Sequence, residues 1–175
     1  IFQNLENQSP TKQKIFAWAL KTGRERLVLL EKRRPVPGGP AFRYRIADRL
    51  VFSKIKARLG GRFQFCMSGG APLSKEVAEF FWTAGVEVYE GYGLTETSPV
   101  LTCNRPDAWK LGSVGKPIPG VAIRLSADGE VLAKGPNVMR GYWNKPEAPN
   151  KGLAAEGWVQ TGAVGRGDPA GFLTL

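Results

Sequence analysis

The chain has 175 residues, 42% of them hydrophobic, which is enough for one domain or two small subdomains with a hydrophobic core. It contains no histidine, so Ser-His-Asp, Cys-His and His–metal chemistry are excluded, and its two cysteines are too few for a disulfide framework or a zinc site. No apolar run approaches the roughly 18 residues of a membrane-spanning helix and no leader opens the chain, so a cytoplasmic location is expected.

The positive charge is concentrated in the first third of the chain. The formal net charge is +10, and the stretch Lys12–Arg62 alone holds 15 Lys and Arg residues against three acids. The remaining chain is therefore slightly acidic. Such a basic stretch suits nucleic acid, an anionic membrane or an acidic metabolite, although a solvated helix surface has the same composition.

This basic stretch is predicted to be helical. Ser9-Pro10 precedes an apolar stripe of helical spacing and is typical of a helix start, with Gly23 as a break. A linker over Pro35–Pro40 interrupts the helical pattern, because prolines and glycines prevent a regular element. The second helix, Phe42–Leu59, is basic and amphipathic, and its expected buried face consists of Ala47, Leu50, Val51 and Ile55.

A strand–helix–strand unit is predicted next. Arg62–Met67 alternates as a strand, a helix begins after Ser74, and Val86–Tyr89 forms a second strand. This order is typical of a parallel βαβ unit, in which the loops after both strands lie at one edge of the sheet. The side chains expected to face inward are Phe63, Phe65 and Met67 on the first strand and Val77, Phe80, Phe81 and Ala84 on the helix.

Two glycine-containing loops follow these strands, Ser68–Leu73 and Glu90–Thr97. Glycine lets the main chain approach a ligand, the Tyr92 ring offers a stacking face for a base, and Thr95 and Glu96 supply oxygens suited to phosphate and Mg²⁺. We therefore expect a nucleotide site at the shared sheet edge. The structural alternative, in which these are ordinary turns after buried strands, explains the same glycines.

The last third is predicted to be β-rich. After Pro106 glycines and prolines recur every few residues, and Asp128-Gly129 between two short apolar runs is a strong hairpin signal. The predicted fold is therefore α/β, with basic helices, a parallel βαβ portion and a small β-barrel-like subdomain. The expected divisions are a helical linker region over 1–60, an α/β nucleotide-site portion over 61–110 and a β-rich subdomain over 111–175.

Five motifs, in their order and spacing, resemble the AMP-forming acyl-CoA synthetases, and most closely their bacterial long-chain fatty acid members. The motifs are SGGAPLS at 68–74, EGYGLTETSPV at 90–100, GSVGKPIPGV at 112–121, GEVLAKGPNVMRGYWNKPEA at 129–148 and GWVQTGAVGRGDPAGFLTL at 157–175. Together they cover most of the chain after residue 67. Five ordered motifs are far more specific than one.

The resemblance implies a two-step reaction. A carboxylate attacks the α-phosphorus of ATP to give an acyl-adenylate and pyrophosphate, and the thiol of CoA then displaces AMP. By the same resemblance Tyr92 stacks on adenine, Thr95 bonds phosphate and Glu96 holds Mg²⁺, so Thr95 and Glu96 are the expected catalytic residues. The other residues implied at the nucleotide site are Gly69, Gly70, Ala71, Glu90, Gly91 and Gly93.

One position departs from the family pattern. The family has an aspartate after Thr161-Gly162 that accepts both ribose hydroxyls, whereas this chain has Ala163. Asp168 is interpreted as the acid of a structural turn and not as a replacement. The phosphate-binding loop and the C-terminal lysine of the family are not found either, so we expect a piece of a longer protein that is inactive alone.

The partners implied by the resemblance are ATP, a long-chain fatty acid and CoA. Peripheral contact with an anionic membrane at its inner face and a homodimer are further expectations, and no nucleic-acid partner is expected. Two other functions remain open at this point. One is a catalytically impaired relative that acts as a binding or membrane-associated protein, and the other is a basic module that acts through Lys12–Arg62.

Overall fold

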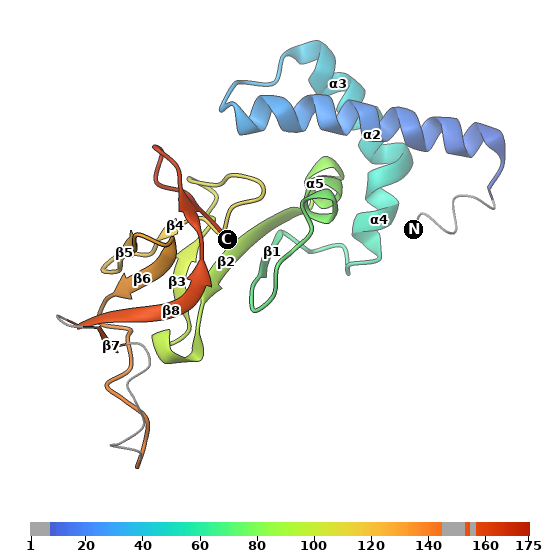
Figure 1. The fold of residues 1–175 in the computed structure, drawn as a ribbon. Helices are drawn as coiled ribbons and strands as arrows, with labels where there is room; N and C mark the ends of the chain where they lie inside the picture. The colour runs from blue at the N-terminus through green and yellow to red at the C-terminus, as the bar shows by residue number, and fades with distance from the viewer. Residues whose placement is uncertain (1–7, 145–152, 155–156) are drawn as a thin grey trace. The chain divides into compact units, whose positions relative to one another are not determined.

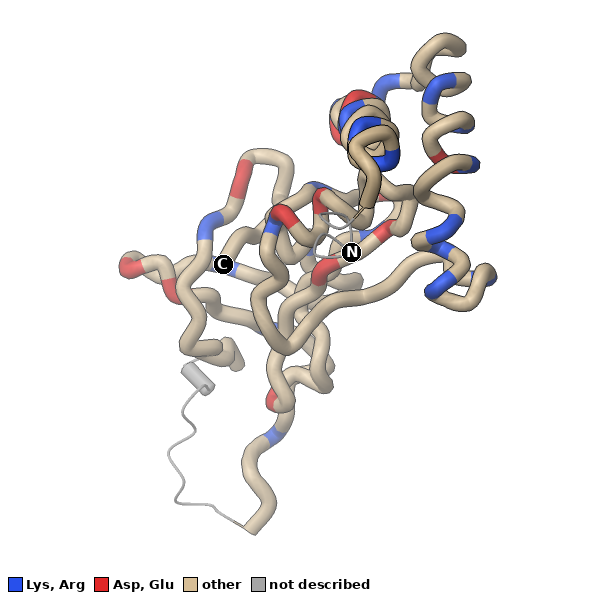
Figure 2. The backbone as a smooth tube through the Cα atoms, turned by 90° about the vertical axis from the view of Figure 1, so that its right-hand side faces the viewer, with Lys and Arg blue, Asp and Glu red and all other residues tan. Residues whose placement is uncertain are grey.

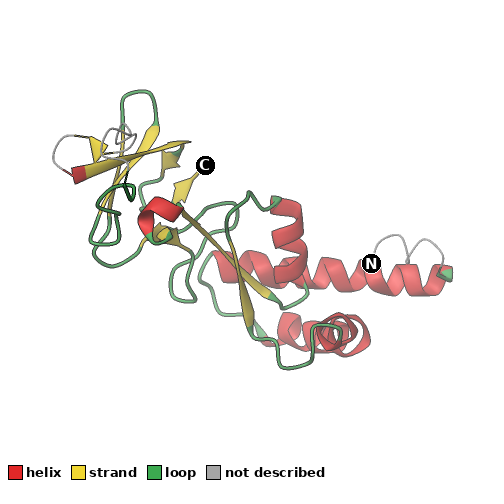
Figure 3. Cartoon of the chain, turned by 90° about the horizontal axis from the view of Figure 1, so that it is seen from below, coloured by secondary structure: helices red, strands yellow, loops and turns green. Residues whose placement is uncertain are grey.

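The chain forms two compact units of mixed α/β structure. The computed structural model describes residues 8–144, 153–154 and 157–175. The first unit comprises Ile1–Cys66 and Ser74–Val88, and the second comprises Met67–Leu73 and Tyr89–Leu175. Figures 1 and 3 show that the long helices belong to the first unit and most strands to the second.

The first unit is built on a 22-residue helix, α2 (Pro10–Glu31), against which α5 (Lys75–Thr83) packs. The predicted break at Gly23 is wrong, because α2 continues through it. A Cβ atom at Gly23 would lie 2.5 Å from the carbonyl oxygen of Thr83, so this glycine allows the two helices to approach closely. No described helix has the length and apolar character needed to cross a membrane.

The second helical stretch begins earlier than predicted and changes its winding. Helix α3 (Gly38–Ala47) starts inside the expected linker, since a proline is tolerated in a first helical turn. A π-helical turn, η1 (Asp48–Phe52), follows, in which the Ser53 N–H donates to the Asp48 carbonyl, and α4 (Ser53–Ala57) completes the stretch.

The π-turn overturns one expectation about the core of this unit. Leu50, predicted to face inward, is exposed, whereas Phe52 is fully buried in a cluster with Ala19, Ala47 and Ala84. A π-turn rotates less per residue than an α-helix. Leu50 therefore stays on the outer side and Phe52 reaches the core.

The structure confirms only one of the two predictions made for α5, its helix cap and its inward face. The Ser74 hydroxyl accepts a hydrogen bond from the Val77 N–H at 3.3 Å, which confirms the predicted helix cap. The expected inward face is shifted, because Val77 is exposed and Trp82 is buried. The Trp82 indole Nε1–H donates to the Val88 carbonyl at 2.9 Å. An aromatic ring with a polar atom thus takes the core position.

The first sheet has the strand order β1-β2-β3-β4. Its strands are β1 (Phe65–Ser68), β2 (Glu87–Gly93), β3 (Val100–Cys103) and β4 (Lys116–Pro117). Strand β3 is antiparallel to both β2 and β4, with Gly91 opposite Cys103 and Tyr92 opposite Thr102. The glycine segment predicted as a loop therefore belongs to strand β2.

The apolar side predicted for β1 is not buried. Phe65 and Met67 are exposed, and the alternate residues Cys66 and Ser68 are partly buried. Side chains alternate between the two faces of a strand, so a pattern of apolar residues identifies one face. The pattern does not show whether that face is covered by another part of this chain.

A second sheet has the order β5-β6-β8-β7, and β9 pairs with β10. The predicted hairpin at Asp128-Gly129 is confirmed, because it joins β5 to its antiparallel neighbour β6. Among the described residues the sheets do not close into a barrel, so the barrel-like expectation is corrected to open sheets. The strands are β5 (Ala122–Leu125), β6 (Glu130–Lys134), β7 (Leu153–Ala154), β8 (Trp158–Val164), β9 (Arg166–Gly167) and β10 (Leu173–Thr174).

We expect Gly23→Ala to destabilise the chain by about 1–3 kcal/mol, because the new methyl group would overlap Thr83. Gly38→Ala, at the start of α3, is the matched control, since no atom beyond its chain neighbours lies within 4 Å of its Cβ position and no proline follows it. The control should be neutral or stabilising by about 0.4–1 kcal/mol. Urea unfolding followed by circular dichroism measures both, and equal stabilities would contradict close packing at Gly23.

Candidate functional site

The turn after β2 is held by a buried hydroxyl group. A short 3₁₀ helix, η2 (Thr95–Thr97), follows the strand, and Thr97 is fully buried. Its Oγ1 accepts a hydrogen bond from the Leu94 N–H at 3.0 Å and donates to the Pro99 carbonyl at 2.9 Å. The Asn137 side-chain amide donates to the Thr97 carbonyl at 2.7 Å. The turn is therefore anchored on both of its sides.

This anchoring leaves the side chains of Thr95 and Glu96 available to a ligand. Thr95 is exposed and Glu96 is partly exposed. The hydroxyl of Tyr142 donates to Glu96 Oε1 at 2.8 Å. This bond, together with a backbone hydrogen bond, lowers the pKa of Glu96 from its usual value, because it stabilises the ionised carboxylate. No ion pair with a described residue occupies this carboxylate.

The donor set at this turn fits a magnesium ion that is bound mainly through phosphate. Mg²⁺ usually takes one or two carboxylates together with phosphate oxygens and water. Glu96 provides an ionised carboxylate next to the Thr95 hydroxyl. No group of three or more His, Cys, Asp or Glu residues suited to a metal is found among the described residues. A metal held by protein ligands alone is therefore not supported in this part of the chain.

The Tyr92 ring lies on β2 and packs against the core of the second unit. Its neighbours there are Leu101, Ala133 and Val159. The Tyr92 hydroxyl is buried and makes no hydrogen bond of standard geometry, although the Thr161 hydroxyl faces it. Burial raises the pKa of Tyr92, and the Thr161 hydroxyl acts in the opposite direction. One end of the ring is thus fixed in the protein.

The two glycine segments lie in contact, as expected for loops at one sheet edge. A Cβ atom at Gly69 would lie 3.3 Å from the carbonyl oxygen of Gly91. Gly70 has φ +80° with open space around it, so its backbone conformation requires glycine. A Cβ atom at Gly93 would overlap the Pro99 carbonyl. Gly93 is therefore required by the chain's own packing.

Glu90 is a buried acid on β2. Its burial raises the pKa of its carboxyl group, and its main-chain carbonyl accepts a hydrogen bond from the Asn104 N–H at 2.8 Å. Ala71, by contrast, is exposed next to Gly70. The expected roles of Glu90 and Ala71 at a nucleotide stay predictions.

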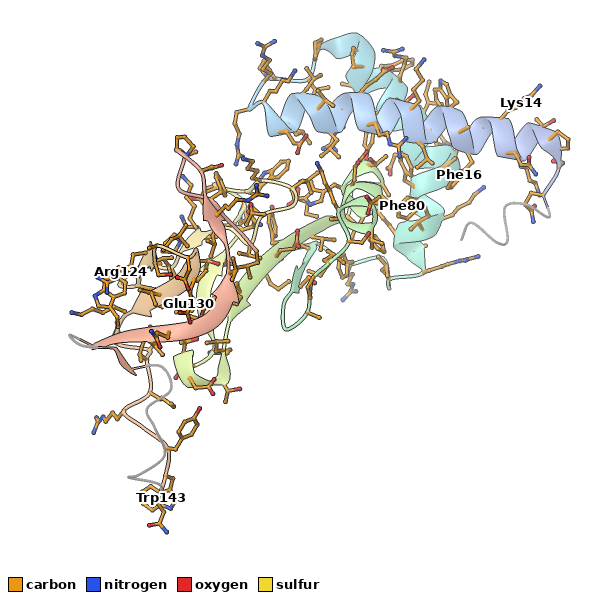
Figure 4. The ribbon with its side chains drawn as sticks, viewed as in Figure 1. Lys14, Phe16, Phe80, Arg124, Glu130 and Trp143 are labelled. Carbon is orange, nitrogen blue, oxygen red and sulfur yellow. The ribbon has the colours of Figure 1, made fainter. Side chains whose placement is uncertain are left out.

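The strand that carries Ala163 presents a different acid. The Gly162 N–H donates to Glu130 Oε1 at 2.9 Å, and the Ala163 N–H donates to Thr161 Oγ1 at 3.3 Å. Glu130, labelled in Figure 4, starts the neighbouring strand β6. A carboxylate therefore lies within hydrogen-bonding distance of this segment although position 163 itself has none.

Asp168 has the structural role predicted for it. Its Oδ1 accepts the Phe172 N–H at 2.9 Å, and the Lys110 Nζ contacts its Oδ2 at 2.7 Å. These hydrogen bonds lower the pKa of Asp168, with the bond from Lys110 contributing most. Asp168 is thus committed to the turn between β9 and β10.

Sequence reasoning missed Tyr142 and Glu130 as parts of this site. Tyr142 is 46 positions from the residue it contacts, and it lies in a motif that assigned it no role. Glu130 directly follows the Asp128-Gly129 turn of the predicted hairpin. A polar residue directly after a hairpin turn is a weak signal, and no spacing rule links it to Gly162.

A comparison with family models matches residues 17–143 to the family described as AMP-binding enzyme. This match covers more than half of the 175-residue chain. The chain therefore belongs to the AMP-binding enzyme family.

Among the members of this family, the chain is similar to curated long-chain-fatty-acid–CoA ligases. The chain is 42% identical over 142 residues to the long-chain-fatty-acid–CoA ligase FadD15 of Mycobacterium bovis, a match that covers 79% of this chain and 24% of that protein. It is 39% identical over 142 residues to human long-chain-fatty-acid–CoA ligase 6, covering 74% of this chain and 20% of the relative. The chain thus spans a quarter or less of the length of these relatives.

Two solved structures have a fold similar to that of this chain. Apo MatB from Rhodopseudomonas palustris has a TM-score of 0.61 at 29% identity, covering 74% of this chain and 28% of that one. The o-succinylbenzoate CoA synthetase MenE from Bacillus subtilis, in complex with ATP and magnesium ion, has a TM-score of 0.55 at 32% identity. That match covers 69% of this chain and 29% of MenE.

We expect Tyr142→Phe to raise the pKa of Glu96, because the substitution removes the hydrogen bond that contributes most to lowering it. A pH titration of side-chain carboxyl carbons by NMR measures this change. Glu76, whose pKa is lowered by hydrogen bonds from its own backbone and from Ser74, is the internal control and should not move. An unchanged Glu96 titration would show that the Tyr142 contact does not form in solution.

Proposed function

We propose that this chain is the central nucleotide-binding segment of an AMP-forming ligase that activates a long-chain fatty acid with ATP and transfers the acyl group to CoA. The observation that carries the proposal is the anchored turn at Thr95–Thr97, which leaves an ionised Glu96 available beside the Thr95 hydroxyl. The names of the curated relatives support the substrate class.

In this proposal each residue has a limited task. Thr95 donates a hydrogen bond to a phosphate oxygen, and Glu96 holds the metal that accompanies ATP. When bound, Mg²⁺ neutralises phosphate charge. Adenine lies against Tyr92, and the absence of side chains at Gly69 and Gly70 leaves room for the nucleotide there. Catalysis then depends on positioning and charge stabilisation more than on covalent chemistry.

Substrates and surroundings also enter as proposals. The complex of MenE with ATP and magnesium ion supports Mg–ATP as the nucleotide form. We place the protein in the cytoplasm, where ATP and CoA are found. Both cysteines, Cys66 and Cys103, are free thiols, which agrees with a reducing compartment. A homodimer stays a prediction.

The direct test uses the complete ligase that contains this segment and measures fatty-acid-dependent ATP–pyrophosphate exchange. We expect Glu96→Gln to lower the exchange rate about a hundredfold or more, because it removes a charge that holds the phosphate-bound metal. Glu76→Gln, on the exposed side of α5, is the charge-matched control and should leave the rate unchanged. Full activity of Glu96→Gln would refute the assigned role.

Ala163 gives a second test in the same protein. By resemblance, an aspartate at this position accepts both ribose hydroxyls, and charge-assisted hydrogen bonds contribute about 1.5–3 kcal/mol each. We expect Ala163→Asp to tighten ATP binding about tenfold or more, measured by calorimetry, and Ala163→Asn to tighten it less. Unchanged binding in both variants would mean that the ribose is held elsewhere, for which Glu130 is the nearby acid.

A further inference from the structure

An apolar stripe runs along the outer side of α3 and η1. Phe42, Ile46 and Leu50 are spaced four residues apart and expose 63%, 38% and 46% of their surface. Residues spaced in this way lie on one helix face. Leu50 lies within the π-turn and is exposed like the other two. We call these three residues the outer stripe.

The outer stripe has no role in the core of its unit. The opposite side of the same helix supplies the core, where Ala47 and Phe52 are fully buried and Tyr44 contacts Phe52 with ring centroids 5.8 Å apart. Packing within the unit therefore does not require large apolar residues on the outer side. Contact with water does not favour large apolar side chains on the outer side either.

Unpaired cations flank the outer stripe. Arg45 and Arg49 are exposed and form no salt bridge with a described residue. Two of the three acids in Lys12–Arg62 are already paired, Glu25 with Arg43 at 3.1 Å and Asp48 with Lys56 at 2.5 Å. Figure 2 shows Lys and Arg along the helices of this unit. The surface around the stripe is thus strongly positive.

We propose that the outer stripe and its arginines bind the surface of an anionic lipid membrane. An interfacial helix combines large apolar side chains, which enter the boundary of the acyl region, with Lys and Arg at the level of the headgroups. Arginine charge alone suits a nucleic acid equally well, but three exposed apolar side chains in line give no advantage against a phosphate backbone. Contact through this face is peripheral and salt-sensitive.

The proposal is tested with the complete ligase that contains this segment and with two kinds of vesicle, phosphatidylcholine alone and phosphatidylcholine mixed with phosphatidylglycerol. We expect sedimentation with the mixed vesicles only, and weaker binding as salt increases. Arg45→Gln/Arg49→Gln should weaken binding about twentyfold, since each cation near an anionic surface contributes about fivefold. Phe42→Ser and Leu50→Ser should each weaken it about tenfold.

Matched controls separate this face from net charge and from unfolding. Lys12→Gln/Lys14→Gln removes the same charge near the N-terminal end of α2, where Figure 4 labels Lys14, and should change binding less than about twofold. Arg45→Lys/Arg49→Lys should retain binding. Helical circular dichroism must be unchanged in every variant that is compared.

Several results would overturn the proposal. They are equal binding to neutral vesicles, binding that does not respond to salt, an equal loss in the Lys12→Gln/Lys14→Gln control, and binding to duplex DNA but not to vesicles. Normal binding by both the arginine and the apolar variants would also overturn it. None of these results bears on ATP–pyrophosphate exchange, so the two proposals fail separately.

Discussion

The buried hydroxyl of Thr97 is the constraint on which the candidate site depends. A side chain with one donor and two acceptor positions links Leu94 to Pro99 and closes the turn between β2 and β3. Asn137 ties the same turn to a segment 40 positions further along the chain. With the backbone held in this way, the main chain at Glu96 does not have to become ordered when its carboxylate meets a ligand. Preorganised charge of this kind is more effective than charge on a mobile loop.

Glycines have two different purposes around this turn. At Gly91 and Gly93 they let β2 and β3 approach, because a side chain there would meet the backbone of β3 or of Pro99. At Gly70 the reason is a left-handed backbone conformation beside open space. Packing within the chain therefore accounts for the first pair, although both glycines lie in strand β2 and not in the turn that the structural alternative assumed. For Gly70 the open space leaves room for the nucleotide expected there.

Local signals in the sequence were sufficient for much of the fold. The cap at Ser74 and the hairpin at Asp128-Gly129 depend on residues a few positions apart, and the structure confirms both. Gly23 was misjudged because its purpose is to accommodate Thr83, sixty positions away. The Tyr142–Glu96 contact was not predictable for the same reason. Distant pairs need the folded chain, since no periodicity or turn rule connects them.

Five motifs were enough to identify the family, because their order and spacing record a shared fold even where single residues have several explanations. Ala163 shows the limit of that approach. The motif around it is present, yet its acid is missing, and only the structure reveals that Glu130 reaches the same strand. Membership of the family therefore does not determine which residue acts at a given position of the site.

The π-turn at Asp48–Phe52 affects which substitutions this protein can tolerate. In a helix of uniform winding the inner and outer faces share one register, so a shift that suits one face disturbs the other. Here the register is reset between Ala47 and Phe52, which places Phe52 inside without turning Leu50 inward. Leu50 can therefore be replaced without disturbing the packing around Phe52. Natural selection can therefore adjust what that surface adheres to while the fold is inherited intact.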